Sequence, residues 1–281
     1  MTVSDEYAFL GGLRLHYRDW ASAAGSAAPL LLLLHGFTAH ARTWDTYAPT
    51  FTPRYRVVAL DARGHGESQW APPGEYGVSR HEADVLALLR ALGRDRVSIV
   101  GISMGGRTAY NVAAHHPDLV ERLVVVDISP TIAPAGASRI QTSVAGNDRF
   151  AAVEEAVDAY LAGAPGAPVE IVRRRIRDNL MVCEDGLLTW RYDEALRRAP
   201  VARPGADDQW PLLSRIVAPT LLLRGSRSDV LTADDADRMV GAIPDARLAV
   251  VDDAGHSIAV DQPAGFLAAA APFLLGDGDA A

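Results

Sequence analysis

The sequence contains a single cysteine, Cys183, and this scarcity excludes two kinds of site. One cysteine forms no intrachain disulfide and builds no metal site with several cysteine ligands. Lysine and arginine are outnumbered by aspartate and glutamate, 27 to 35, which gives a formal net charge of −8. Because binding to phosphate backbones needs concentrated positive charge, this balance disfavours nucleic acid as a partner.

Long apolar runs are also missing. The longest aliphatic run covers residues 30–34, far short of the ~20 residues that a membrane-spanning helix needs. Residues 1–6 show no basic region followed by an apolar core, so we expect no signal peptide. We therefore expect a cytoplasmic protein without a membrane partner. The sequence leaves open whether it is a monomer or a homodimer.

Short, continuously apolar runs alternate with helical patterns along the chain. Such runs are typical of parallel strands that are covered on both faces, so the sequence predicts an α/β fold with helices on both sides of a mostly parallel sheet. The expected buried strands are residues 30–34, 56–60, 96–100, 123–127, 220–224 and 247–251. Near the N-terminus we expect an antiparallel hairpin that turns at Gly11 and Gly12.

The alternation stops between residues 129 and 210, where no buried-strand run occurs. Apolar residues recur there at helical spacing, at 150, 153, 157, 160 and 161 and again at 172, 176 and 180. We predict a core domain of residues 1–128 and 211–281, interrupted by a helical cap, residues 129–210, over the carboxyl edge of the sheet.

The segment from Gly101 to Gly105 has the G-x-S-x-G spacing that holds a serine nucleophile on a strained turn. A predicted strand precedes it and a predicted helix follows it, which is the context such a turn requires. The sequence therefore predicts Ser103 as a nucleophile. The neighbouring Ile102 is expected to shape the wall of the site.

A serine nucleophile needs a histidine base, and the eight histidines differ in their surroundings. His256 directly follows the last predicted strand, so it reaches the edge of the sheet where ligands bind. His65 belongs to a polar turn, residues 61–68, that we expect to brace neighbouring loops by hydrogen bonds. We predict His256 as the base.

Two aspartates are placed to hold that histidine. Asp229 follows the predicted strand 220–224, and Asp127 ends the strand 123–127. Either carboxylate would orient the imidazole and stabilise its protonated form. We favour Asp229 slightly and keep Asp127 as the alternative.

An acyl-transfer site also needs two donors for the negatively charged oxygen that develops in the transition state. The N–H of Met104 lies at the N-terminus of the predicted helix after Ser103. Gly36 allows the loop after residues 30–34 to curl, so we expect the N–H of Phe37 to be the second donor.

At this point the chain resembles the α/β-hydrolase-fold serine hydrolases. The resemblance lies in LLLLHGFTAHARTWD, YRVVALDARGHGES, VSIVGISMGGRTAYNVAAHHPDLVERLVVVDISP, PTLLLRGSRSDVL and DDAGHSIAVDQP, which cover most of residues 13–128 and 211–275. It implies an eight-stranded, mostly parallel sheet with a helical cap and a Ser-Asp/Glu-His triad. Within that family, many members place the acid where Asp229 lies, and some esterases and amide-cleaving members place it where Asp127 lies. The cap segments AVEEAVDAYLAG and CEDGLLTWRYDEALRR are similar to those of acetamidomethylene-succinate hydrolases of vitamin B6 breakdown.

These features predict a cofactor-free and metal-free hydrolase of a small-molecule ester, lactone or amide. Two alternatives stay open: hydrolysis of a carbon–carbon bond in a vinylogous diketone by the same triad, and a non-catalytic small-molecule receptor on the same fold. In the cap, Arg139, Trp190 and Tyr192 are candidate substrate-binding residues. Of the arginines at 173, 174, 175 and 177, most are expected to be solvated, with one able to reach an anionic substrate.

Overall fold

The computed structural model describes residues 2–163, 166–198 and 208–276 and contains an eight-stranded sheet. Its order is β1-β2-β4-β3-β5-β6-β9-β10. Strand β2 is antiparallel to both of its neighbours, and every other neighbouring pair in the sheet is parallel. The predicted fold class is therefore confirmed. The bounds are β1 (Val3–Leu10), β2 (Leu13–Trp20), β3 (Leu30–Leu34), β4 (Arg56–Leu60), β5 (Val97–Ile102), β6 (Val120–Val126), β9 (Thr220–Gly225) and β10 (Ala246–Val251).

The predicted N-terminal hairpin is also present. Leu10 of β1 pairs with Leu13 of β2, so Gly11 and Gly12 alone form the turn. Both have positive φ, 57° and 84°, as a tight two-residue hairpin turn of this type requires.

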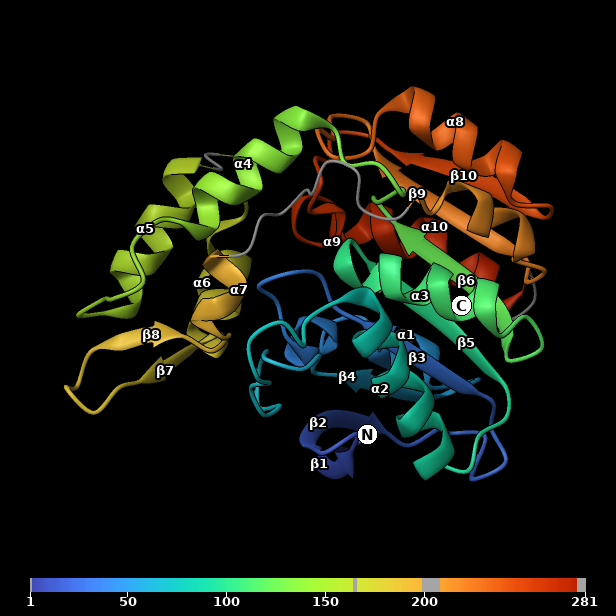
Figure 1. Ribbon diagram of the computed structural model, residues 1–281, viewed down its shortest axis with the longest axis horizontal. Helices are drawn as coiled ribbons and strands as arrows, with labels where there is room; N and C mark the ends of the chain where they lie inside the picture. Colours follow the sequence, from blue (N-terminus) through green and yellow to red (C-terminus); the bar gives the residue numbers. More distant parts are fainter. Residues whose placement is uncertain (1, 164–165, 199–207, 277–281) are drawn as a thin grey trace.

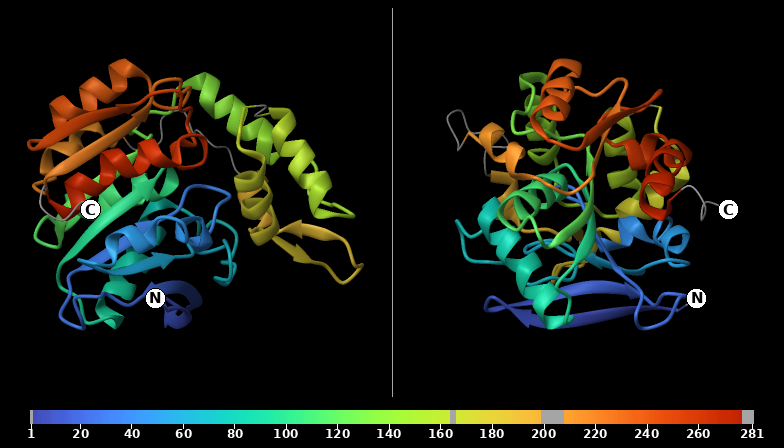
Figure 2. Two further views of the ribbon diagram at one scale, coloured as in Figure 1. Left: turned by 180° about the vertical axis from the view of Figure 1, so that it is seen from behind. Right: turned by 90° about the vertical axis from the view of Figure 1, so that its right-hand side faces the viewer.

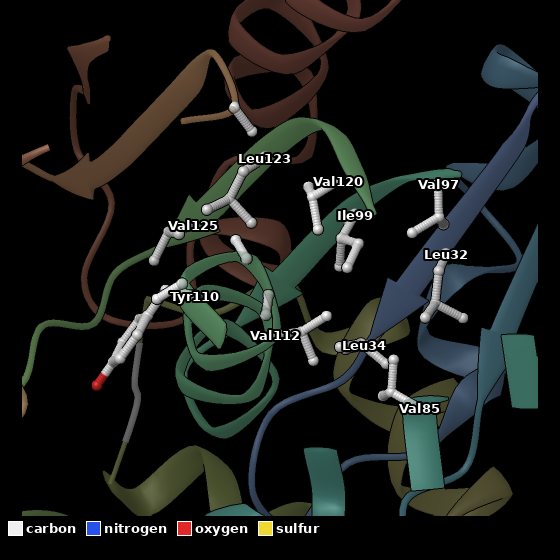
Figure 3. Close-up of a cluster of buried hydrophobic side chains, with 14 of the residues drawn as sticks. Leu32, Leu34, Val85, Val97, Ile99, Tyr110, Val112, Val120, Leu123 and Val125 are labelled. Atoms are coloured by element: carbon white, nitrogen blue, oxygen red, sulfur yellow. The ribbon is translucent and has the colours of Figure 1, made fainter. Parts of the chain in front are cut away.

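Successive leucines of β3 point to opposite faces of the sheet and join two separate apolar clusters. Leu30, Leu32 and Leu34 belong to one cluster, and Leu31 and Leu33 to the other. The first cluster, part of which is drawn in Figure 3, is covered by α2 (Val78–Ala91), α3 (Met104–His115), η2 (Trp210–Arg215) and α8 (Ala233–Ala242). The second is covered by η1 (Ala41–Trp44), α1 (Ala48–Phe51), α9 (Ile258–Asp261) and α10 (Pro263–Leu275). Both faces are buried, which explains why the strands read as continuously apolar.

Strand β10 departs from this pattern. It forms the edge of the sheet, and Val250 on it is 48% exposed. The sequence predicts a buried strand here because its residues are apolar, but an edge strand has a neighbour on one side only.

A helical segment follows β6 and lies to one side of the sheet (Figures 1 and 2). Its core includes Phe150, Val157, Val172 and Ile176, and it meets Val260 of α9. The predicted apolar faces are confirmed for the residues of α5 and α6, but Phe150 precedes α5 and Leu180 begins β7. The short hairpin β7–β8 was not expected, since strands of three residues carry too little pattern to detect. The division into core and cap domains stays a prediction, and residues 164–165 and 199–207 of the proposed cap lie outside the described residues. The segment's elements are α4 (Pro134–Val144), α5 (Val153–Gly163), α6 (Val169–Asp178), β7 (Leu180–Val182), β8 (Leu188–Trp190) and α7 (Glu194–Arg198).

No helix in the described part of the chain combines the length and the apolar character needed to cross a lipid bilayer.

The turn from β5 into α3 is packed backbone against backbone. A Cβ atom added to Gly101 would lie 2.3 Å from the carbonyl oxygen of Gly105, and one added to Gly105 would lie 2.4 Å from that of Leu34. Neither contact leaves room for a side chain, so both glycines are required by the geometry of the turn, as the sequence pattern predicts.

Replacing Gly105 with alanine should therefore lower the free energy of unfolding by about 2–3 kcal/mol, because the new methyl group overlaps fixed backbone atoms. Gly241→Ala is the matched control: that glycine lies in α8 with nothing within 4 Å of an added Cβ. The control should be neutral or more stable by about 0.5–1 kcal/mol. Urea unfolding followed by circular dichroism measures both, and equal midpoints for the two variants would contradict the close approach.

Candidate active site

Ser103 occupies the turn between β5 and α3 with a backbone conformation that a non-glycine residue rarely adopts. Its φ is 52° and its ψ is −112°, which is the kind of strained position that recurs at functional sites. Its N–H donates to the carbonyl of Val126 at the end of β6 (2.9 Å). The hydroxyl lies 3.1 Å from Nε2 of His256, which follows β10.

Nδ1 of His256 lies 2.9 Å from Oδ2 of Asp127. Asp127 is fully buried and directly follows β6. Its carboxylate also accepts hydrogen bonds from the N–H of Gly225 (3.1 Å, to Oδ1) and from the hydroxyl of Ser228 (to Oδ2). The described residues thus contain a hydrogen-bonded chain from Ser103 through His256 to Asp127.

Asp229 is not part of that chain, so the preference for it as the partner of the histidine is corrected by the geometry. Its carboxylate accepts two hydrogen bonds from Arg139 of α4, at 2.6 and 2.7 Å, and it is about one third exposed. The hydrogen bonds from Arg139 lower the pKa of Asp229. The physical reason is position: Asp127 directly follows β6 with a φ of 52°, whereas Asp229 comes after the end of β9 at Gly225 and its carboxylate meets Arg139.

The loop after β3 passes directly beside the serine. A Cβ atom added to Gly36 would lie 3.6 Å from that of Ser103, and Phe37 lines the same pocket as Ser103. Among the described residues, neither the N–H of Phe37 nor that of Met104 donates a hydrogen bond. Both predicted donors are therefore free to bind a ligand oxygen.

His35 and the turn at residues 61–68 brace this loop, as the sequence analysis predicts for that turn. The Nδ1–H of His35 donates to the carbonyl of Gly36 (2.7 Å), and its Nε2 accepts from the N–H of Ala62 (3.0 Å). Burial lowers the pKa of His35 to about 3 and that of the neighbouring His65 to about 4. Both imidazoles are thus neutral near pH 7, and the tautomer of His35 is set by its two backbone partners.

A pocket of about 130 Å³ opens over Ser103 and His256. This volume is smaller than the ~300–1,000 Å³ of most ligand sites, so it suits a small molecule. Its polar wall includes Arg139, Tyr160 and Arg175, and the described residues that line it include no aspartate or glutamate. The apolar lining residues include Ile102, Ile140, Val144, Ala259 and Val260.

Arg175 of α6 is the arginine of its helix that reaches the pocket. Within the described residues it makes no ion pair, and its guanidinium contacts the hydroxyl of Tyr160 at 3.4 Å. It is one of the four arginines, at 173, 174, 175 and 177, of which one was predicted to reach an anionic substrate. Positions 172, 175, 176 and 179 share one helical face, on which Val172, Ile176 and Asn179 are buried, and this pattern is the signal in the sequence that favours Arg175.

The other two candidate residues in this segment pack rather than line the pocket. The ring of Trp190 stacks on Tyr192 and meets Phe150 edge-on. Tyr192 stacks in turn on His65 and is 5% exposed. The structure therefore brings Arg139 to Ser103 but not Trp190 or Tyr192. No cluster of potential metal ligands occurs among the described residues.

Comparison with known proteins gives a consistent picture. The model of the alpha/beta hydrolase fold matches residues 29–180. An esterase of Mycobacterium tuberculosis is 31% identical over 85% of this chain and 80% of its own length. The 2-(acetamidomethylene)succinate hydrolase of Mesorhizobium japonicum is 30% identical over 89% of this chain and 87% of its own. A crystal structure of E-2-(acetamidomethylene)succinate hydrolase superposes with a TM-score of 0.86 at 29% identity, covering 97% of this chain and 99% of that one.

The two aspartates give a direct test of the hydrogen-bonded chain. Asp127→Asn removes the charge that stabilises a protonated His256, so the kcat for hydrolysis of a 4-nitrophenyl ester should fall by about 10⁴-fold. Asp229→Asn, the matched control, should lower kcat by less than about tenfold, since Asp229 contacts Arg139 instead of the histidine. A larger loss in Asp229→Asn than in Asp127→Asn would reverse the assignment.

Proposed function

This chain belongs to the α/β-hydrolase fold family and is a hydrolase, and we propose that it cleaves a small, carboxylate-bearing ester or amide through an acyl-enzyme on Ser103. The observation that carries the proposal is the continuous hydrogen-bonded chain from Ser103 to Asp127 beside a pocket that contains Arg175, an arginine without a carboxylate partner among the described residues.

Formation of the acyl-enzyme begins at the carbonyl carbon of the substrate. Oγ of Ser103 attacks this carbon while Nε2 of His256 takes the hydroxyl proton. Asp127 holds Nδ1–H of the imidazole and stabilises the positive charge that forms on it. The oxygen that becomes negative accepts hydrogen bonds from the N–H groups of Phe37 and Met104.

Collapse of the tetrahedral intermediate breaks the bond to the alcohol or amine, and His256 returns its proton to that leaving group. Water then enters and loses a proton to His256 as it attacks the acyl carbon. A second collapse restores the hydroxyl of Ser103 and releases the carboxylic acid. Besides the substrate and water, these steps use only Ser103, His256, Asp127 and the two backbone N–H groups.

The charge of the pocket supports an anionic substrate. Arg139 is neutralised by Asp229, whereas Arg175 has no carboxylate partner among the described residues. An arginine that faces a small pocket and has no carboxylate partner there favours a ligand that supplies the carboxylate. The similar enzyme from Mesorhizobium japonicum is named for a succinate that bears an acetamidomethylene group, which is the same combination of an amide with carboxylates.

Labelling with a fluorophosphonate probe tests the nucleophile. The probe should modify the unaltered protein at one site, and Ser103→Ala should abolish this reaction because, among the described residues, the hydroxyl of Ser103 is the one that contacts Nε2 of His256. Ser143→Ala is the matched control, since Ser143 lines the same pocket without contacting His256. Full labelling of Ser103→Ala would refute the acyl-enzyme mechanism.

A pair of substrates tests the role of Arg175. Arg175→Gln should lower kcat/KM for mono-4-nitrophenyl succinate by about 10- to 150-fold, which corresponds to the ~1.5–3 kcal/mol of a hydrogen bond to a charged group. The uncharged 4-nitrophenyl butyrate should change by less than about threefold. Arg177→Gln on the same helix is the control, because Arg177 is 62% exposed in its side chain. An equal loss of kcat/KM on both esters would show that Arg175 does not bind the carboxylate of the substrate.

A further inference from the structure

The loop that carries the N–H of Phe37 has little internal support. One backbone hydrogen bond closes it, from the N–H of Ala39 to the carbonyl of Gly36 (3.1 Å). Thr38, next to Phe37, has a φ of 61°. A β-branched residue rarely adopts this left-handed conformation, so the surroundings must hold it there.

The contact that holds it comes from the helical segment. Nδ2 of Asn179, the residue after α6, donates to the carbonyl oxygen of Thr38 at 2.7 Å. The two residues are 141 positions apart in the chain. This bond fixes the peptide between Thr38 and Ala39, two peptides beyond the one that carries the N–H of Phe37. It therefore restrains the short loop in which that N–H lies.

Asn179 is itself fixed firmly. Its N–H donates to the carbonyls of Arg175 (3.2 Å) and Ile176 (3.0 Å), which ends α6, and its carbonyl accepts from the N–H of Arg191 (2.7 Å). Its side chain is buried, and the side-chain oxygen Oδ1 has no partner among the described residues. Burying an unpaired carbonyl oxygen costs stability. The position of the side-chain amide therefore satisfies the hydrogen bond from its NH₂ group to Thr38, while its own carbonyl oxygen stays without a partner among the described residues.

We propose that Asn179 is a positioning residue for catalysis, which acts from α6 by holding the carbonyl of Thr38 so that the N–H of Phe37 faces the developing oxyanion. This inference rests on the proposed function, because it assigns Phe37 to the oxyanion site. Asn179 does not line the pocket, so its effect passes through the loop and not through contact with the substrate.

The test replaces Asn179 with leucine, which fills a similar volume and donates no hydrogen bond. Loss of a whole oxyanion donor lowers kcat by about 10²–10³-fold; a donor that is present but no longer fixed should cost about 10- to 100-fold. KM should stay within about threefold, since ground-state binding is unchanged. Asn147→Leu is the matched control: Asn147 also donates to a backbone carbonyl, that of Arg149, but lies on an exposed loop. That control should keep the kcat of the unaltered protein.

A transition-state analogue separates positioning from a merely structural role. The inhibition constant of n-butylboronic acid, which forms a tetrahedral adduct on serine, should rise in Asn179→Leu by the same factor by which kcat falls. The inhibition constant of butyrate, a ground-state product, should stay nearly constant. Thermal unfolding identifies the folded variants, and Asn179→Ala gives the same comparison if the leucine variant does not fold.

The outcomes distinguish this inference from the proposed function. If the unaltered protein reacts with neither the boronic acid nor a fluorophosphonate, the proposed function fails. If it reacts with both and the folded Asn179 variant keeps its kcat, or loses affinity for butyrate as much as for the boronic acid, the proposed function stands and the role of Asn179 is overturned.

Discussion

Close backbone contact around the turn from β5 to α3 determines where the groups of the site stand relative to one another. The turn touches β3 through Gly105 and the carbonyl of Leu34, and it is tied to β6 by the hydrogen bond from Ser103 to Val126. The chain beyond β3 becomes the loop with Phe37, and the chain beyond β6 becomes Asp127. One tightly packed turn therefore sets the distance from the serine to both neighbouring strand ends, and the strain at Ser103 is maintained by the sheet on either side.

The helical segment adds side chains to the site at the carboxyl edge of the sheet and contacts the loops there. Its polar contacts with the loops beside Ser103 include those of Arg139 with Asp229 on the loop after β9 and of Asn179 with Thr38 on the loop after β3. Between these contacts it supplies Tyr160 and Arg175 to the pocket. The sheet thus provides the reacting groups, while this segment provides positive charge and restrains the loops that flank the serine.

Much of this arrangement is predictable from the sequence, because apolar runs, the Gly101–Gly105 spacing and the place of His256 after the last strand each reflect one local constraint. The choice between Asp127 and Asp229, in contrast, does not follow from a local constraint in the sequence. Both follow strands that are neighbours in the sheet, and the outcome depends on the direction of one side chain and on Arg139, which is distant in sequence. Arg175 and Asn179 carry a detectable signal, since positions 172, 175, 176 and 179 share one helical face. That pattern marks the face that meets the core, but it does not reveal which carbonyl an amide will bind.

The three residues of the hydrogen-bonded chain follow strands that differ in how well the sheet supports them. Ser103 and Asp127 follow β5 and β6, which pair side by side in the interior of the sheet. His256 follows β10, which pairs with β9 alone and is partly open to water. Edge strands open locally at lower free energy than the interior of a sheet. Mild heating would therefore separate the histidine from an otherwise intact serine–aspartate scaffold, so that inactivation precedes global unfolding and is reversed on cooling.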